Sequence, residues 1–143
     1  MLRQFVAQIM GLRQEGQYAQ ALQVLVQAQE RLFARPFPAF ATLDIDEQLQ
    51  LLSAGESKEG VREKHLGYAL LLREAGLCYR ALDRDDLSAS ALSLALHVAL
   101  CIAVTDAEHC EEIADLIKEL LSQVSIPTLH EPTRELLMRW SQS

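Results

Sequence analysis

A near-repeat of small and aromatic residues at helical spacing constrains the fold of this chain most. The first copy covers residues 16–22 (GQYAQAL), and similar spacings recur at residues 76–79 (GLCY) and 86–92 (DLSASAL). Small side chains at such positions let two helices approach closely. The pattern therefore predicts an all-α fold built from antiparallel helical hairpins.

Apolar residues recur at the three-and-four spacing of one helical face through most of the chain. They predict a first hairpin over about residues 2–14 and 18–34, followed by a loop at 35–40 where two prolines interrupt the pattern. A short helix over residues 45–52 follows, capped by Asp44 or Asp46. Longer helices are expected from between Ser57 and Glu63 to residue 82, from Asp85 or Asp86 to 105 and over 106–124. A last short helix is expected over 132–140. We expect six or seven helices and a single domain spanning residues 1–143, with Gly76 at a close helix contact.

The charge of the chain restricts its partners. The formal net charge is −7, and no two Lys or Arg residues are adjacent. This charge repels phosphate backbones, so we expect no nucleic-acid partner. Residues 106–119 carry six carboxylates against Lys118 alone, and a solvated helix face is the favoured interpretation of that cluster.

Residues 87–105 form a run of nineteen positions without a formal charge, which is long enough for a membrane span. The run contains three serines and His97, and its flanks are acidic rather than basic. A helix that neighbours cover on several sides is also apolar all round. We therefore interpret the run as a buried core helix and expect no membrane association.

Three cysteines occur at positions 78, 101 and 110. The first ten residues are amphipathic and lack the continuous apolar stretch of a signal peptide. We therefore expect a cytoplasmic protein whose thiols are reduced and buried.

Residues 16–28 resemble the second half of a tetratricopeptide unit, through Gly16, Tyr18, Ala21, Leu22 and Leu25, and residues 76–79 resemble the first half of another. Over about residues 5–140 the order of elements is similar to that of a bacterial family of tetratricopeptide-like proteins of unknown function. This resemblance implies a right-handed array of helical hairpins and no established activity. Members often end in a further hairpin, so the end of this chain looks incomplete and leaves an apolar face near Leu136, Leu137 and Trp140.

His97 and Cys101 lie four residues apart on one helix face, as two metal ligands would. A third ligand would have to be Cys78 or His109, and no established ligand motif supports a site. Core packing is the favoured interpretation, and a Cys101 buried in an apolar run would be a poor nucleophile. A cation cluster of Glu108, Glu111, Glu112 and Asp115 is likewise disfavoured against a solvated face. We expect no catalytic, metal or cofactor-binding residue.

Phe33, Phe37 and Phe40 surround the two prolines. They either present an aromatic ridge to a partner or fold back to close the end of the first hairpin, and we favour the second interpretation. Trp140 is either a core residue or part of a dimer contact.

These observations predict a non-enzymatic protein-interaction or scaffold module, with homodimerisation near Leu136, Leu137 and Trp140 as its most specific form. The alternative is a small-ligand sensor. Its pocket would lie between the helices expected up to residue 82, from Asp85 or Asp86 to 105 and over 106–124, where Gly76, Ala89, Ala91 and Ala95 leave little side-chain bulk. An enzyme would require a cleft that gathers His97, His109 or His130 with a carboxylate.

Overall fold

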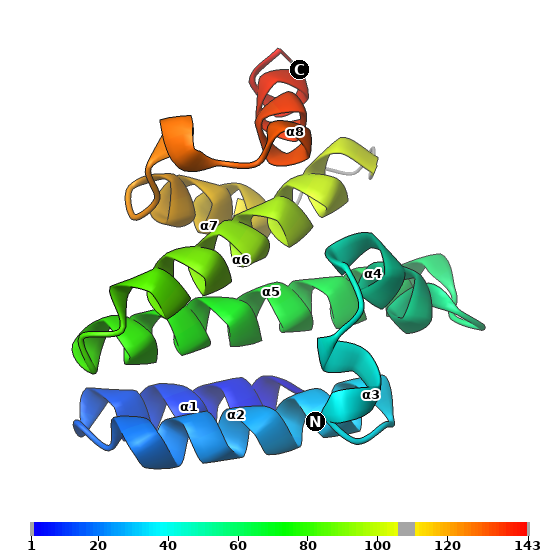
Figure 1. The fold of residues 1–143 in the computed structure, drawn as a ribbon. Helices are drawn as coiled ribbons and strands as arrows, with labels where there is room; N and C mark the ends of the chain where they lie inside the picture. Colours follow the sequence, from blue (N-terminus) through cyan, green and yellow to red (C-terminus); the bar gives the residue numbers. More distant parts are fainter. Residues whose placement is uncertain (1, 106–110, 143) are drawn as a thin grey trace.

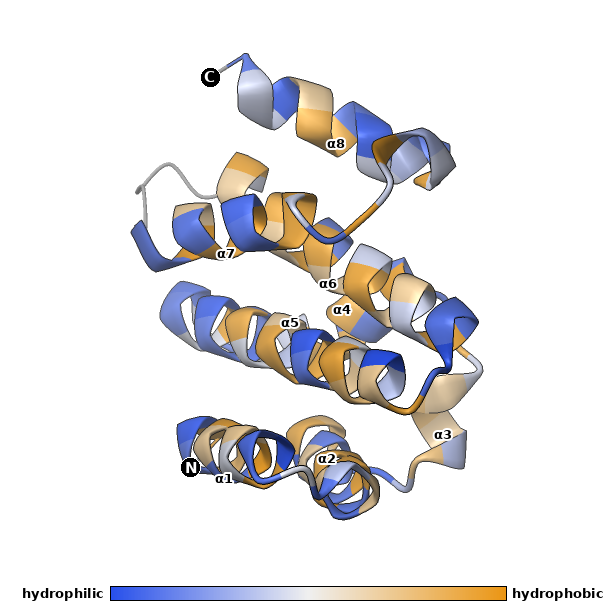
Figure 2. Ribbon diagram, turned by 90° about the vertical axis from the view of Figure 1, so that its left-hand side faces the viewer, coloured by the Kyte–Doolittle hydropathy of each residue, from blue (hydrophilic) through white to orange (hydrophobic). Residues whose placement is uncertain are grey.

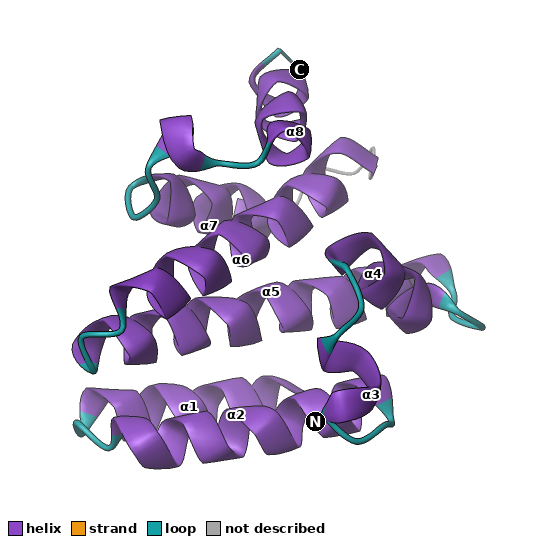
Figure 3. Ribbon diagram, in the orientation of Figure 1, coloured by secondary structure: helices purple, strands orange, loops and turns teal. Residues whose placement is uncertain are grey.

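The structure is a computed structural model that describes residues 2–105 and 111–142. Over these residues the chain forms helices joined by loops and contains no strand (Figure 3). The helices are α1 (Leu2–Gln14), α2 (Tyr18–Phe33), α3 (Pro38–Ala41), α4 (Ile45–Ser53), α5 (Lys58–Ala81), α6 (Asp85–Thr105), α7 (Glu111–Leu121), a 3₁₀ helix η1 (Ile126–Thr128) and α8 (Glu131–Ser141). The expected all-α fold is confirmed.

Two expected boundaries were wrong. The segment expected as a loop contains α3, because Pro38 occupies its first position, where a proline has no helical hydrogen bond to lose. Helix α7 ends at Leu121 rather than at Val124. The Ser122 hydroxyl there donates to the Glu119 carbonyl at 2.6 Å, and the Gln123 amide donates to a carbonyl only three residues back. The chain thus has eight α-helices over the described residues, more than the six or seven expected.

From the hairpin of α1 and α2 at one end, α5, α6 and α8 follow one another through the molecule (Figure 1). The hairpin of α1 and α2 packs against α5, and α5 makes its most extensive contact with α6. Helices α7 and α8 both pack on α6, while α4 packs beside α5. Figure 2 shows α1 and α2 at one end, α8 at the other and α5 and α6 between them.

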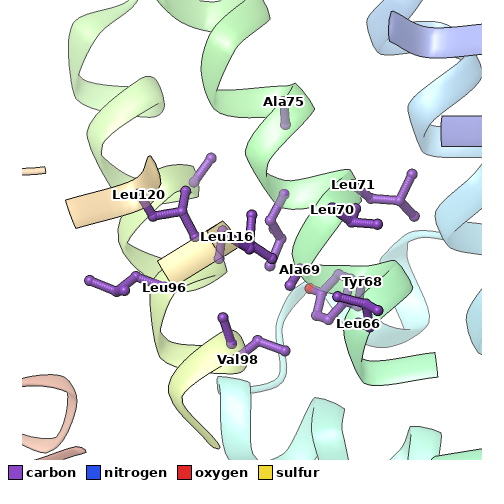
Figure 4. Close-up of a cluster of buried hydrophobic side chains, with 14 of the residues drawn as sticks. Leu66, Tyr68, Ala69, Leu70, Leu71, Ala75, Leu96, Val98, Leu116 and Leu120 are labelled. Atoms are coloured by element: carbon purple, nitrogen blue, oxygen red, sulfur yellow. The ribbon is translucent and has the colours of Figure 1, made fainter. Parts of the chain in front are cut away.

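One hydrophobic cluster runs from α1 to the segment before α8. Figure 4 shows part of this cluster, with Leu66, Ala69 and Leu70 on α5, Leu96 on α6 and Leu116 on α7. Helix α6 is surrounded by α5, α7 and α8, and this explains its uncharged sequence. It is also the one helix over the described residues that is long and apolar enough to cross a membrane, although 56% of its most apolar window is buried inside the protein, as in a core helix.

Gly76 lies at the close contact between α5 and α6 that its sequence context predicts. A Cβ atom at position 76 would lie 2.5 Å from Cγ of Leu92 and 3.3 Å from the carbonyl oxygen of Ser88. The Ser88 hydroxyl donates a 2.7 Å hydrogen bond to the Gly76 carbonyl. The absent side chain is therefore what allows the two helices to pack at this distance.

A buried ionic cluster connects α1, α5 and α7. The Glu74 carboxylate is fully buried and accepts hydrogen bonds from Nε of Arg13 at 2.8 Å and from Nε of Arg73 at 3.2 Å. Nη1 of Arg73 also lies 3.5 Å from Glu119 of α7. Because a buried carboxylate is stable only when it is paired, this cluster fixes how the three helices meet.

Candidate functional site

Two adjoining hollows lie along one face of α6. The first, which we call the His97 pocket, has a volume of about 470 Å³ and lies between α4, α6 and the η1–α8 segment. The second, which we call the apolar groove, has a volume of about 260 Å³ and lies between α2, α3, α5 and α6. Ser90 and Leu94 line both hollows, so the two adjoin each other, and together we call them the concave surface along α6.

The spacing of residues on α6 explains this shared surface. Ser90, Leu94 and His97 recur at intervals of four and three residues, which places them on one side of a helix in successive turns. Ala89 and Ser93 also line the pocket, and their small side chains add little bulk. The same side of α6 therefore lines both hollows.

Asp46 enters the His97 pocket from the first turn of α4. A capping box fixes this turn: the Asp44 carboxylate accepts the Glu47 amide at 2.8 Å, and the Glu47 carboxylate accepts the Asp44 amide at 3.4 Å. The sequence left Asp44 and Asp46 as alternative caps, and the structure assigns the cap to Asp44. Asp46 is thereby free of the capping role, and its side chain is 78% exposed.

His97 links the pocket wall on α6 to α8. Its Nδ1 lies 2.9 Å from the Thr133 hydroxyl, and its Nε2 lies 3.7 Å from the Asp46 carboxylate. Burial lowers the pKa of His97, and nearby His130 lowers it further, against an opposing effect of Asp46. When Thr133 donates to Nδ1, the single proton of the neutral ring sits on Nε2 and faces Asp46.

Three large hydrophobic side chains that line the apolar groove are partly exposed to solvent. Val26, Phe37 and Leu87 are 36%, 39% and 37% exposed, and all three line this groove. Over the described residues, the other large exposed apolar side chains are Leu82, Ile126 and Met138, which line neither hollow. A grouping of exposed apolar residues in one concavity is typical of a binding surface.

Hydrogen bonds and aromatic contacts fix the positions of Phe40, Gln48 and Tyr68, which line the groove. The Gln48 amide donates to the carbonyls of Phe40 and Leu43 at 3.0 and 3.2 Å, and its oxygen accepts the Tyr68 hydroxyl at 2.5 Å. Phe33 stacks on Phe40 with ring centres 4.3 Å apart and meets Tyr68 edge to face. These contacts attach α3 and α4 firmly to α5.

The three phenylalanines divide between the two interpretations that the sequence left open. Phe33 and Phe40 are buried and close the end of the first hairpin, as favoured. Phe37 packs its edge against Phe40 with ring centres 5.3 Å apart, yet remains partly exposed in the groove. Only Phe37 is thus available to a partner.

The structure does not bring the suggested metal ligands together. Charged neighbours of Cys78 are Glu74 and Arg13, whereas those of Cys101 are Asp46 and Arg139. Over residues 2–105 and 111–142, no group of three His, Cys, Asp or Glu side chains is arranged to hold a metal ion. His109 and Cys110 lie outside the described residues.

Cys101 is not an activated thiol. Burial raises its pKa to about 11, with a further increase from Asp46 and a smaller opposing effect of Arg139. The thiolate is the nucleophilic form, so this side chain stays unreactive near neutral pH.

One member of the acidic cluster suggested by the sequence, Glu112, forms an ion pair within the protein. Glu112 pairs with Arg3 of α1 through two contacts of 2.6 and 3.0 Å, and this pairing lowers the pKa of Glu112. Glu111 and Asp115 are exposed, and Glu108 lies outside the described residues.

The small residues proposed to line a ligand cavity do not share one. Gly76 packs against Leu92, and Ala95 is fully buried. Ala89 lines the His97 pocket, on a different side of α6 from the one expected, while Ala91 lines the apolar groove. The two hollows described above thus lie elsewhere than between α5, α6 and α7, where the sequence suggested a cavity.

At the end of the chain, Leu136, Leu137 and Trp140 are partly buried against the core. Met138 is the most exposed large apolar side chain of α8. The apolar face expected there is thus partly covered by the protein itself.

Sequence reasoning did not find Asp46 or Thr133 as neighbours of His97. The two residues lie 51 positions before and 36 positions after it, in short helices without a motif. The available signals were local: Asp46 follows a capping residue, and Thr133 follows Pro132 at the start of α8. Neither signal shows which helix packs against α6.

Comparison with protein-family models, with curated proteins and with solved structures returned no match. The resemblance to tetratricopeptide-like proteins therefore stays a prediction.

Proposed function

We propose that this protein is a non-enzymatic interaction module with a tetratricopeptide-like array of hairpins, and that it binds a peptide segment of a partner protein in the concave surface along α6. The observation that carries this proposal is the grouping of Val26, Phe37 and Leu87 in one groove that adjoins the His97 pocket. Burying these side chains under a partner removes apolar area from water, worth about 25 cal/mol per Å².

Other features support the same proposal. The high pKa of Cys101 argues against thiol catalysis, and the His97–Thr133 contact is itself buried. The formal charge of −7 supports a partner other than nucleic acid. The protein is expected to be cytoplasmic, and the coverage of α6 by its neighbours argues against a membrane-embedded helix.

A selection of random peptides displayed on phage tests the proposal. The target proteins are the wild type, Leu87→Asp and the matched control Leu82→Asp, since both leucines are exposed to a similar extent but only Leu87 lines the groove. We expect related peptides to be enriched on the wild type and on Leu82→Asp, and to be lost on Leu87→Asp. Absence of enrichment on the wild type, or equal enrichment on Leu87→Asp, would contradict the proposal.

The second candidate function is a small-ligand sensor, and the His97 pocket is the observation that favours it. Its volume of about 470 Å³ falls in the usual range for ligand sites, and Asp46, Ser93, His97 and Thr133 supply polar groups in an otherwise apolar lining. A thermal-shift screen against a metabolite library, repeated on Ser93→Phe to fill the pocket, tests it. A ligand that stabilises both proteins equally would exclude this pocket as its site.

Self-association near Leu136, Leu137 and Trp140 is the homodimeric form of the proposal. The exposed Met138 on the same helix supports it. Light scattering at high micromolar concentration should then give twice the monomer mass, and Met138→Asp should give the monomer mass. A strict monomer for the wild type would remove this form.

A further inference from the structure

We propose that the peptide segment bound along α6 carries a lysine or arginine next to its apolar anchors, and that the Asp46 carboxylate receives that cation. This inference rests on the proposed function and assigns the chemistry of the partner to particular residues of the site.

The first argument is the charge of the lining. Among the described residues that line the His97 pocket and the apolar groove, Asp46 is the only aspartate or glutamate, and none is a lysine or arginine. Its side chain is exposed, so a cation can reach it from solvent. The concave surface is therefore apolar with a single anionic position.

The second argument is that the histidine beside Asp46 does not neutralise it. Burial lowers the pKa of His97, so its ring carries no charge near neutral pH and offers Asp46 only an N–H at a distance of 3.7 Å. Arg139 of α8 is close enough to influence the pKa of Cys101, as Asp46 does, but Arg139 does not line either hollow. The carboxylate is thus open to an incoming ammonium or guanidinium group, whose charge-assisted hydrogen bonds exceed those of neutral donors.

The third argument is the position of the carboxylate. The capping box holds the first turn of α4, and the buried Gln48 and Tyr68 attach α4 to α5. Asp46 therefore projects from a fixed helix end rather than from a loop, and less side-chain and backbone freedom is lost when a partner binds.

The geometry of α6 also sets the spacing in the partner. Leu87 in the groove and His97 beside Asp46 are ten positions apart on one helix, which corresponds to about 15 Å along its axis. An extended peptide covers this distance in about four or five residues. We expect the basic residue at about that separation from the outermost apolar anchor.

The phage selection described above tests this inference when it is extended to Asp46→Asn and Asp46→Lys. The matched control is Asp115→Lys on α7, which changes the net charge by the same amount as Asp46→Lys but is exposed and outside both hollows. We expect wild type and Asp115→Lys to enrich lysine or arginine at one fixed position. Asp46→Asn should remove this preference, and Asp46→Lys should replace it by aspartate or glutamate.

The outcomes separate the two proposals. Enriched peptides with apolar anchors but no basic position, or a basic preference that survives in Asp46→Lys, would overturn the inference while leaving the proposed function standing. No enrichment on any protein would overturn both. If no peptide is enriched and the wild type forms a dimer that Leu87→Asp dissociates, the concave surface binds a second copy of the chain. This outcome would also overturn the inference. Unchanged circular dichroism of each variant confirms that it is folded.

Discussion

Replacing Glu74 by alanine should destabilise the protein more than any other single change to an ion pair described above. The Glu74 side chain is fully buried, and its two partners, Arg13 and Arg73, are only 23% and 14% exposed. Removing the carboxylate leaves two largely buried guanidinium groups without their shared anion. Breaking a buried pair in this way costs about 3–5 kcal/mol. This is a large fraction of the roughly 5–15 kcal/mol that keeps a typical domain folded.

Glu119→Ala is the matched control, because Glu119 contacts the same Arg73 at 3.5 Å but is 41% exposed. An exposed pair contributes only about 0–1 kcal/mol. Urea unfolding followed by far-ultraviolet circular dichroism measures both variants. We expect a much lower midpoint for Glu74→Ala at an unchanged slope, and a small shift for Glu119→Ala. Equal shifts for the two variants would refute the account of the buried cluster.

Two further predictions concern glycine packing and pH. Gly76→Ala should destabilise the protein by about 1–3 kcal/mol through overpacking, partly offset by the higher helix propensity of alanine. Gly11→Ala in α1 should instead stabilise the protein by up to about 1 kcal/mol, because nothing lies within 4 Å of the new Cβ. Urea unfolding that ranks the two variants in the opposite order would contradict the close helix contact at Gly76. Burial lowers the pKa of both His65 and His97 from the ordinary value of 6.5. As pH falls, these histidines therefore become protonated in the unfolded chain before they do so in the folded protein. Their contribution to the free energy of unfolding is fully present above about pH 6.5 and is lost as pH falls towards the lowered pKa values of the folded state. Thermal unfolding between pH 7.5 and 5 should show this loss, and the double variant His65→Gln, His97→Gln should show a smaller one; an identical pH dependence would exclude these histidines as its source.

Local patterns predicted most of the helices. The bounds of α1 agree with the expected range, and α2 ends one residue early at Phe33. Gly76 could be predicted as a contact point because a glycine inside a helix is unfavourable unless close packing compensates it. These predictions depend on neighbours within a few residues, for which periodicity is informative.

The site could not be predicted in the same way. His97 was recognised, but of its proposed partners Cys78 has other charged neighbours, Glu74 and Arg13, and Cys101 shares only Asp46 with it. Its actual neighbours, Asp46 and Thr133, come from helices whose positions depend on packing over the whole chain. Periodicity assigns a face to each helix but does not show which other helix covers it.

Glu74 illustrates the same limit. In sequence it is one of many charged residues of a long helix, and a charged residue is usually exposed. Its burial becomes understandable only once α1 brings Arg13 to it. The expected solvated face was correct for exposed residues such as Asp115, but this pattern does not identify a buried pair.

The most direct test of the central claim is to map the binding surface by nuclear magnetic resonance. ¹⁵N-labelled protein would be titrated with a peptide chosen by the phage selection, and amide shifts would be followed residue by residue. We predict that the largest changes occur at Val26, Leu87, Ser90, Leu94 and Asp46, which line the concave surface. Changes concentrated instead on α1, on α7 or around Met138 would contradict the claim that the protein binds its partner along α6.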